Sequence, residues 1–368
     1  MLEPHIRRPA SMNRDMSTAP LRKWSAAGAI GIVLLAALAV LPFYTRATAD
    51  PFLLTLASRI LIFAIAALSL NLILGYGGLV SFGHALYLGL GVYAAVIPSF
   101  HGMDNGWLQL LIAVLACGVT GLVTGAIALR TQGISFIMIT LAFAQMFFFL
   151  FVSLSQYGGD DGLRLASGSN FSGVLLTEPR TLYFSAFLVL CFSLYGCHRL
   201  VHARFGLVVR GAKSNEKRMR ALGFPTFRYR LALYVISAIL CGVAGLLYGN
   251  LTQFGSPSYM SWTTSGELIV MVMLGGMGTL FGPLYGALAM ILTEEGLKSI
   301  TEHWMVIFGP LIVLLITVSR LGIAGLLQAR DGDGAGPARG GTRETAWAPP
   351  ALDNDSQPAN NTEAKEPT

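Results

Sequence analysis

The amino-acid sequence predicts an all-α membrane protein, a polytopic bundle of about ten transmembrane helices. Hydrophobic residues make up 54% of its 368 positions and charged residues only 12%, with a mean hydropathy of +0.62. A soluble globular domain carries roughly twice that charged fraction. Between residues 231 and 319 only five side chains are charged. A surface in water cannot be built from such a stretch, whereas lipid tolerates exposed apolar side chains.

Apolar runs of spanning length recur along the chain, judged against a need for about 20 residues per helix. They lie at 25–45, 51–74, 79–99, 107–129, 134–155, 181–198, 229–251, 264–279, 281–297 and 304–320. The run at 264–279 is short and glycines interrupt its end, so 264–297 is either two spans or one broken helix. Ala47-Thr48-Ala49 is typical of a signal-peptidase site. The apolar core before it is too long for a signal peptide and further spans follow, so we expect the first span to be retained.

Lysine and arginine indicate the orientation of the bundle. The segment 1–24 carries five Lys/Arg against two acidic residues, and the loop at 199–230 carries nine against one. The loop at 156–181 instead carries three acidic residues against two arginines. Because cytoplasmic loops are enriched in Lys and Arg, we expect both termini inside and the loop at 156–181 outside.

The expected organisation has three parts. A basic cytoplasmic segment at 1–24 precedes a transmembrane domain at 25–325, which contains a cytoplasmic loop at 199–228. After residue 326 the chain is rich in Gly, Pro, Asp, Asn, Thr and Glu. Such a composition cannot bury a core, so we expect 326–368 to be a disordered cytoplasmic tail.

Catalytic and metal-binding patterns are missing from the sequence. The histidines beyond the first segment have no carboxylate or thiol at ligand spacing, and the four cysteines lie singly in apolar runs. The stretch 206–214 is similar to a phosphate-binding loop, but Ala212 separates Gly211 from Lys213. We therefore expect no enzyme activity, metal, cofactor or nucleotide on this chain. The basic residues indicate membrane anchoring and not a nucleic-acid partner.

An ion-coupled secondary carrier or channel is the alternative class. Such proteins usually keep ionisable groups at mid-membrane. Here Arg59 and Glu267 lie near predicted span ends and only His84 lies well within a span. Because ionisable side chains are scarce within the spans, a carrier is disfavoured. An ion site made of backbone oxygens would not be visible in the sequence, so the carrier stays open as the alternative. A membrane-embedded enzyme would need the catalytic cluster that is missing.

The loop at 199–228 contains a predicted short helix. Asn215 is a plausible helix cap, and Gly223 followed by Pro225 ends the helical stretch. One interpretation is a positively charged anchor on the cytoplasmic side. The other is a coupling helix that inserts into a separate ATP-binding subunit.

Several motifs in a fixed order give the chain a specific resemblance. They include Ser81-Phe82-Gly83-His84-Ala85 and lie at 70–78, 81–85, 140–146, 158–163, 205–225, 256–257, 262–267 and 274–283. With these motifs the chain resembles the permease subunits of branched-chain amino acid ABC importers over roughly residues 55–325. Its Arg220-Ala221-Leu222-Gly223 is a weak relative of the broader importer loop pattern.

The resemblance implies a division of labour among several proteins. This chain and a second permease subunit would form the pathway, two ATPase subunits would drive it, and a periplasmic solute-binding protein would deliver the solute. The place would be the bacterial inner membrane, with membrane lipid around the bundle. The solute would be leucine, isoleucine, valine or a similar small molecule. Urea and short amides are the alternative within the same family.

The resemblance also implies roles for residues. The loop residues expected to contact an ATPase are Arg210, Gly211, Asn215, Glu216, Arg218, Ala221, Leu222 and Gly223. Polar residues in or beside spans are expected along the pathway, namely Asn71, Ser81, His84 and Gln145. The other interpretation of these four is that they hold helices together by hydrogen bonds. Asp160 and Asp161 of the outer loop are expected to meet the binding protein.

Overall fold

The computed structural model describes residues 26–48, 51–300, 303, 306–310, 313 and 322–325. The expected basic segment at 1–24 and the expected tail at 326–368 lie outside the described residues. Most of the tenth expected span, 304–320, lies outside them as well.

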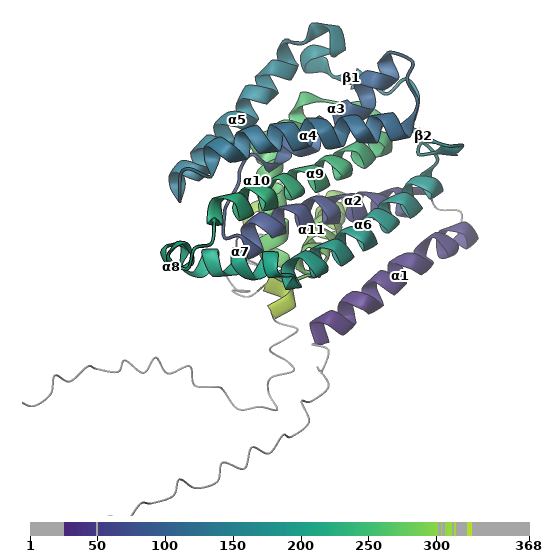
Figure 1. The fold of residues 1–368 in the computed structure, drawn as a ribbon. Coiled ribbons are helices and arrows are strands. Elements are labelled where there is room, and N and C mark those ends of the chain that lie inside the picture. Colours follow the sequence, from purple (N-terminus) through teal and green to yellow (C-terminus); the bar gives the residue numbers. More distant parts are fainter. Residues whose placement is uncertain are drawn as a thin grey trace, which may run out of the picture. The chain divides into compact units, whose positions relative to one another are not determined.

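Within the described residues the fold is a bundle of α-helices, and each of the first nine apolar runs contains one (Figure 1). These helices are α1 (Ala26–Thr48), α2 (Pro51–Asn71), α3 (His84–Phe100), α4 (Gly106–Ala128), α5 (Ile134–Ser153), α6 (Pro179–His202), α9 (Thr226–Thr252), α10 (Trp262–Gly275) and α11 (Gly282–Ile300). Five described helices are long and apolar enough to cross a membrane: α2 with the π-helical turn after it, α4, α5, α6 and α9. This supports a polytopic all-α membrane protein.

The predicted start of the third span, residue 79, was wrong. A π-helical turn, Leu72–Tyr76, ends α2, and irregular backbone follows until α3 begins at His84. Gly78 has a φ of +70°, which suits a residue without a side chain. The apolar composition of 79–83 is that of a span, but the glycines around it stop the helix.

Close contact between α3 and α9 forms the centre of the bundle. A methyl group on Gly91 would overlap the Gly242 carbonyl oxygen, and one on Gly245 would overlap the Leu88 carbonyl oxygen. Glycine at these positions therefore lets the two backbones touch, as small residues do between membrane helices.

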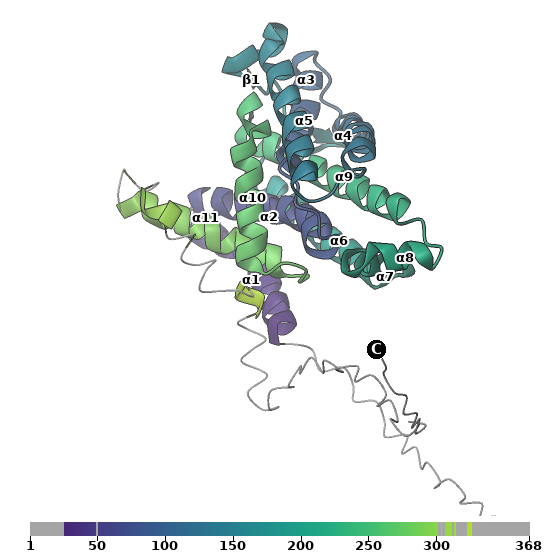
Figure 2. The same cartoon turned by 90° about the vertical axis from the view of Figure 1, so that its left-hand side faces the viewer.

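The stretch 264–297 is not one continuous helix. α10 ends at Gly275 and α11 begins at Gly282. Between them Gly276 and Gly278 have φ values of +113° and +75°, which L-residues with side chains rarely adopt. Figure 2 shows α10 and α11 leaving this turn in different directions.

Short β-pairs form in the loop between α5 and α6 and after α9, where sequence reasoning expected no strand. β1 (Leu163–Arg164) pairs antiparallel with β4 (Phe254–Gly255), and β2 (Asn170–Phe171) pairs antiparallel with β3 (Val174–Leu175). The first pair ties the loop after α5 to the end of α9.

The outward faces of α4 and α6 are apolar. The large apolar side chains exposed there include Leu115, Val119, Leu122 and Val123 on α4, and Phe184, Leu188, Phe192 and Tyr195 on α6. Such faces suit contact with lipid tails and would be unusual in water.

Candidate functional site

His84, the first residue of α3, belongs to a buried hydrogen-bond network. It has no exposed surface, and its Nε2 lies 2.8 Å from the Ser69 hydroxyl of α2. Ser69 donates to the Ala66 carbonyl oxygen over 2.6 Å, and Ser237 of α9 donates to the Ser69 carbonyl oxygen. Because the one Ser69 hydroxyl hydrogen is used on Ala66, Nε2 of His84 carries the ring proton. Its Nδ1 is then an acceptor to which no described residue donates.

A tyrosine pair borders this histidine. The Tyr87 hydroxyl lies 2.7 Å from Thr124 Oγ1 of α4 and donates to the Tyr234 hydroxyl of α9 over 3.0 Å. The rings of His84 and Tyr87 meet edge to face, with centroids 5.7 Å apart. Ser81 is also fully buried and lies beside Tyr234. The structure thus brings the expected Ser81 and His84 into one polar region, whose other members sequence reasoning missed.

Asn71 has a separate set of contacts. Its Nδ2 donates to the Thr279 carbonyl oxygen over 2.9 Å, and its Oδ1 accepts from the Gly278 N–H over 2.9 Å. Both partners belong to the turn between α10 and α11. Asn71 is fully buried, so in this conformation it holds that turn against the end of α2.

Gln145 lies apart from these networks. It is half-buried on α5, and its side chain makes no hydrogen bond with another described residue. The four expected pathway residues therefore do not form one cluster. Among the described residues, no three His, Cys, Asp or Glu side chains gather as a metal site.

The loop at 199–228 folds into two short helices, α7 (Arg204–Ser214) and α8 (Glu216–Ala221). Asn215 Oδ1 accepts from the Arg218 N–H over 3.0 Å, so the expected cap is confirmed. Gly223 follows with a φ of +85°, and the chain turns there as expected. Sequence reasoning missed α7, because its stretch was examined only as a failed phosphate-binding loop.

Four of the eight residues that are expected to contact an ATPase make contacts that hold the loop together. Glu216 pairs with Arg220 at 2.5 Å and with Arg230 of α9 at 2.7 Å. It also accepts from Gln132 over 3.0 Å. Arg210 donates to the Val201 carbonyl oxygen at the end of α6 over 3.3 Å. The other two of these four residues are Asn215, which caps α8, and Gly211, which lies against Met219.

The remaining expected residues form an exposed tip. Arg218, Ala221, Leu222 and Gly223 are all exposed, and 66% of Leu222 is accessible. The contacts of Arg210, Gly211, Asn215 and Glu216 hold the backbone of this tip in place. Other described residues leave most of the Leu222 side chain uncovered.

Lys213 connects this loop to the interior. Its Nζ donates to the Gly75 carbonyl oxygen in the π-helical turn over 2.7 Å. Gly75 lies one turn after Asn71, which holds the turn between α10 and α11. A continuous chain of contacts therefore runs from the loop at 199–228 to the middle of the bundle.

Asp160 and Asp161 lie in a 3₁₀ turn, Gly159–Asp161, in the loop after α5. Both are exposed. They are thus accessible to a partner, on a loop that the β1–β4 pair anchors.

Known proteins show what the chain is similar to. A family model described as branched-chain amino acid transport system / permease component matches residues 52–316. The high-affinity branched-chain amino acid transport system permease protein LivM of Escherichia coli K12 is 29% identical over 313 residues, covering 77% of this chain and 72% of that protein. The LivH permease protein of Salmonella typhimurium is 25% identical over 286 residues, covering 72% of this chain and 91% of that protein.

A third relative has a similar name. The probable branched-chain amino acid transport permease protein LivM of Methanocaldococcus jannaschii is 25% identical over 276 residues, covering 63% of this chain and 77% of that protein. No solved structure matches the chain. Because the family model covers most of the chain, including every helix from α2 to α11, this protein belongs to the branched-chain amino acid transport system permease family.

Proposed function

We propose that this chain is one permease subunit of an ATP-driven importer in the bacterial inner membrane, forming half of a pathway for leucine, isoleucine and valine. Its relatives are named as branched-chain amino acid permeases of two kinds, LivM and LivH. Two related permeases in one system favour a pathway built from two different subunits. The second permease is thus the first expected partner.

The observation that carries the proposal is the exposed tip of the loop at 199–228. Leu222, with 66% of its surface accessible, is the most exposed large apolar side chain of this loop, and Glu216 and Asn215 hold the helix that precedes it. We assign this tip to docking of an ATPase subunit, with Arg218, Ala221, Leu222 and Gly223 in contact with it. Arg210, Gly211, Asn215 and Glu216 would act by holding the tip in place.

We propose ten spans with both termini in the cytoplasm. The domain then extends over 25–325, with the loop at 199–228 inside and Asp160 and Asp161 outside, facing a solute-binding protein. Ser81, His84 and Gln145 are proposed along the pathway. Asn71 is proposed to act on the pathway through the turn that it holds.

The test is uptake by proteoliposomes that contain this chain, a second permease and the ATPase subunits encoded with it, with the matching binding protein outside. We expect leucine uptake that requires ATP inside the vesicles. Uptake that follows a proton or sodium gradient without ATP would overturn the proposal in favour of an ion-coupled carrier. Uptake of radiolabelled urea in place of leucine would assign the other solute class.

A further inference from the structure

Four charged side chains gather on one face of the transmembrane bundle. Arg59 of α2 donates from Nη2 to both carboxylate oxygens of Glu294 of α11, over 3.2 and 3.3 Å. Lys298 donates to Glu294 over 2.6 Å. Glu267 of α10 lies within electrostatic range of all three. Three helices therefore contribute to one cluster of mixed sign.

This cluster is poorly suited to contact with lipid tails. Arg59 lies seven residues into the apolar helix that starts at Phe52, or about 10 Å along its axis at about 1.5 Å per residue. Yet 30% of the Arg59 side chain and 35% of the Lys298 side chain are exposed. Charged groups inside membrane spans are usually directed to the bundle interior or to a water-filled cavity. The apolar faces of α4 and α6, by contrast, are suited to lipid.

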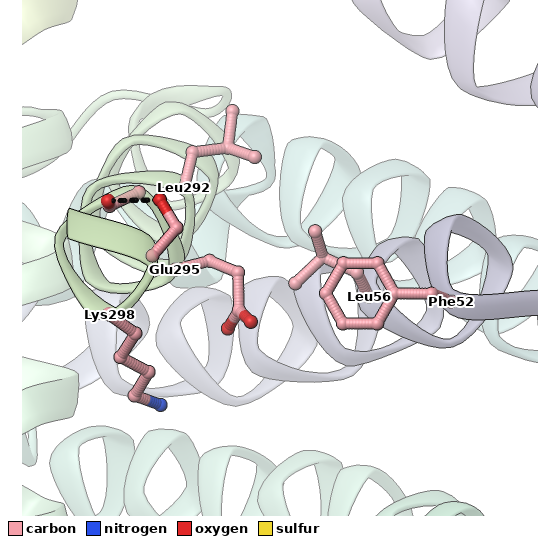
Figure 3. A pocket seen from close by; sticks show the side chains of 7 residues that line it. Phe52, Leu56, Leu292, Glu295 and Lys298 are labelled. Carbon is pink, nitrogen blue, oxygen red and sulfur yellow. Dashed lines mark hydrogen bonds between the residues drawn. The ribbon is translucent and has the colours of Figure 1, made fainter.

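A groove lies beside this cluster, between the first turns of α2 and the last turns of α11 (Figure 3). Its volume is about 470 Å³, and it is lined by Phe52, Leu56, Leu292, Glu295, Gly296, Lys298 and Ser299. Figure 3 shows Glu295 reaching from α11 towards Leu56 and Phe52. The Glu295 carboxylate makes no ion pair or hydrogen bond with another described residue.

The groove combines three features that suit one class of ligand. Phe52, Leu56 and Leu292 supply apolar surface, Lys298 supplies a positive charge, and Glu295 supplies a negative charge. Small-molecule sites of roughly 300–1,000 Å³ are typically apolar with a few placed polar groups. A free amino acid carries one charge of each sign and, in the branched-chain class, an aliphatic side chain.

We infer that this groove is a wall of the translocation pathway that binds a zwitterionic amino acid. Lys298 pairs with the α-carboxylate, Glu295 pairs with the α-ammonium group, and Phe52, Leu56 and Leu292 contact the aliphatic side chain. Arg59 and Glu294 position Lys298. The inference rests on the proposed function, and it assigns recognition of both charges to this subunit and not only to a binding protein.

A cysteine in the groove tests this directly. Ser299→Cys places a thiol among the lining residues while Glu295 and Lys298 stay intact. The permease–ATPase complex in nanodiscs, without binding protein, is treated with a charged methanethiosulfonate reagent. The unchanged protein gives the background from the four native cysteines. Leu188→Cys on the lipid-suited face of α6 is the matched control.

We expect Ser299→Cys to react at least tenfold faster than Leu188→Cys. Leucine at millimolar concentration should slow the reaction at least threefold, whereas isopentylamine and 4-methylpentanoate, which carry one charge each, should not. Adding Glu295→Gln should abolish the protection by leucine, measured against the unprotected rate of the same double variant.

Three results would overturn the inference. These are a rate no higher than that of Leu188→Cys, no protection by leucine, and equal protection by the singly charged compounds. ATP-driven leucine uptake by the same preparation, reconstituted with binding protein, separates the two claims. If uptake is normal and protection is absent, only the groove assignment fails; if uptake is absent in the unchanged complex, the proposed function itself fails.

Discussion

Glu216 and Arg230 form an ion pair with 2.7 Å between Oε2 and Nη1, which joins the exposed helix α8 to the membrane helix α9. Only 15% and 12% of their side chains are exposed, so solvent screens the pair less than it screens a surface pair. The same carboxylate also pairs with Arg220 and accepts from Gln132. One acidic residue in a basic loop therefore fixes the position of α8.

Glu216→Gln should loosen this loop without unfolding the bundle. Loss of the charge weakens the bonds to Arg220 and Arg230, so α8 should open locally more often. We expect trypsin to cleave after Arg218 or Arg220 several-fold faster, measured by mass spectrometry of timed digests. Glu178→Gln, an exposed change at the start of α6, is the control. Equal cleavage rates in both variants would show that the ion pair does not hold the loop.

Asn71→Leu should destabilise the fold by removing both bonds to the turn between α10 and α11. The Gly278 N–H and the Thr279 carbonyl oxygen would lose their partner, and each unsatisfied buried group costs about 1–3 kcal/mol. The measurement is the thermal midpoint of unfolding in detergent. The control is Asn105→Ala, which removes an exposed helix cap and should cost about 1 kcal/mol. A smaller loss for Asn71→Leu than for Asn105→Ala would contradict this role.

Gly245→Val should separate α3 from α9. Even the first carbon of a side chain at this position would overlap the Leu88 carbonyl oxygen, so the helices must move apart and lose packing. We expect a strong fall in the amount of folded protein extracted from the membrane. Gly196→Val on α6 is the matched change, since nothing lies within 4 Å of a side chain there. If both variants give the same yield, close α3–α9 contact is not required.

Much of the fold was predictable from the sequence, because the length of an apolar run and the placement of Gly and Pro are local signals. They gave a helix in each of the first nine runs, and Asn215 and Gly223 gave the bounds of α8. The start of α3 was missed because the apolar residues before His84 resemble a span. Contacts over long separations were not predictable. Asn71 and Gly278 are 207 residues apart, and no local pattern links them.

The same limit applies to the candidate site. Single polar residues in spans, such as Ser81 and His84, stand out in an apolar sequence. Their partners Tyr87 and Tyr234 do not, because aromatic residues are common in membrane helices and only the fold brings this pair together. Glu216 is expected as a contact residue, and its ion pairs with Arg220 and Arg230, which the sequence did not indicate, hold α8 in place.

Lys213→Met should uncouple the loop from the interior. The Lys213 Nζ bond to the Gly75 carbonyl oxygen is the link between α7 and the turn that ends α2. We expect the ATPase to remain bound while ATP-driven leucine uptake falls at least tenfold. Lys217→Met, an exposed lysine of α8, should leave uptake nearly unchanged. A loss of bound ATPase in Lys213→Met would show that this lysine serves docking and not coupling.

The central claim is that the tip of the loop at 199–228 docks an ATPase. The most direct measurement is mild-detergent purification of this chain with Leu222→Glu, followed by quantification of the ATPase that co-purifies. Leu175→Glu is the matched control, since Leu175 is exposed to 51% on β3, in the loop between α5 and α6, and Leu222 to 66%. The account predicts at least tenfold less ATPase with Leu222→Glu, an unchanged amount with Leu175→Glu, and equal thermal midpoints for the two permeases. Undiminished ATPase on the Leu222→Glu permease would contradict the claim.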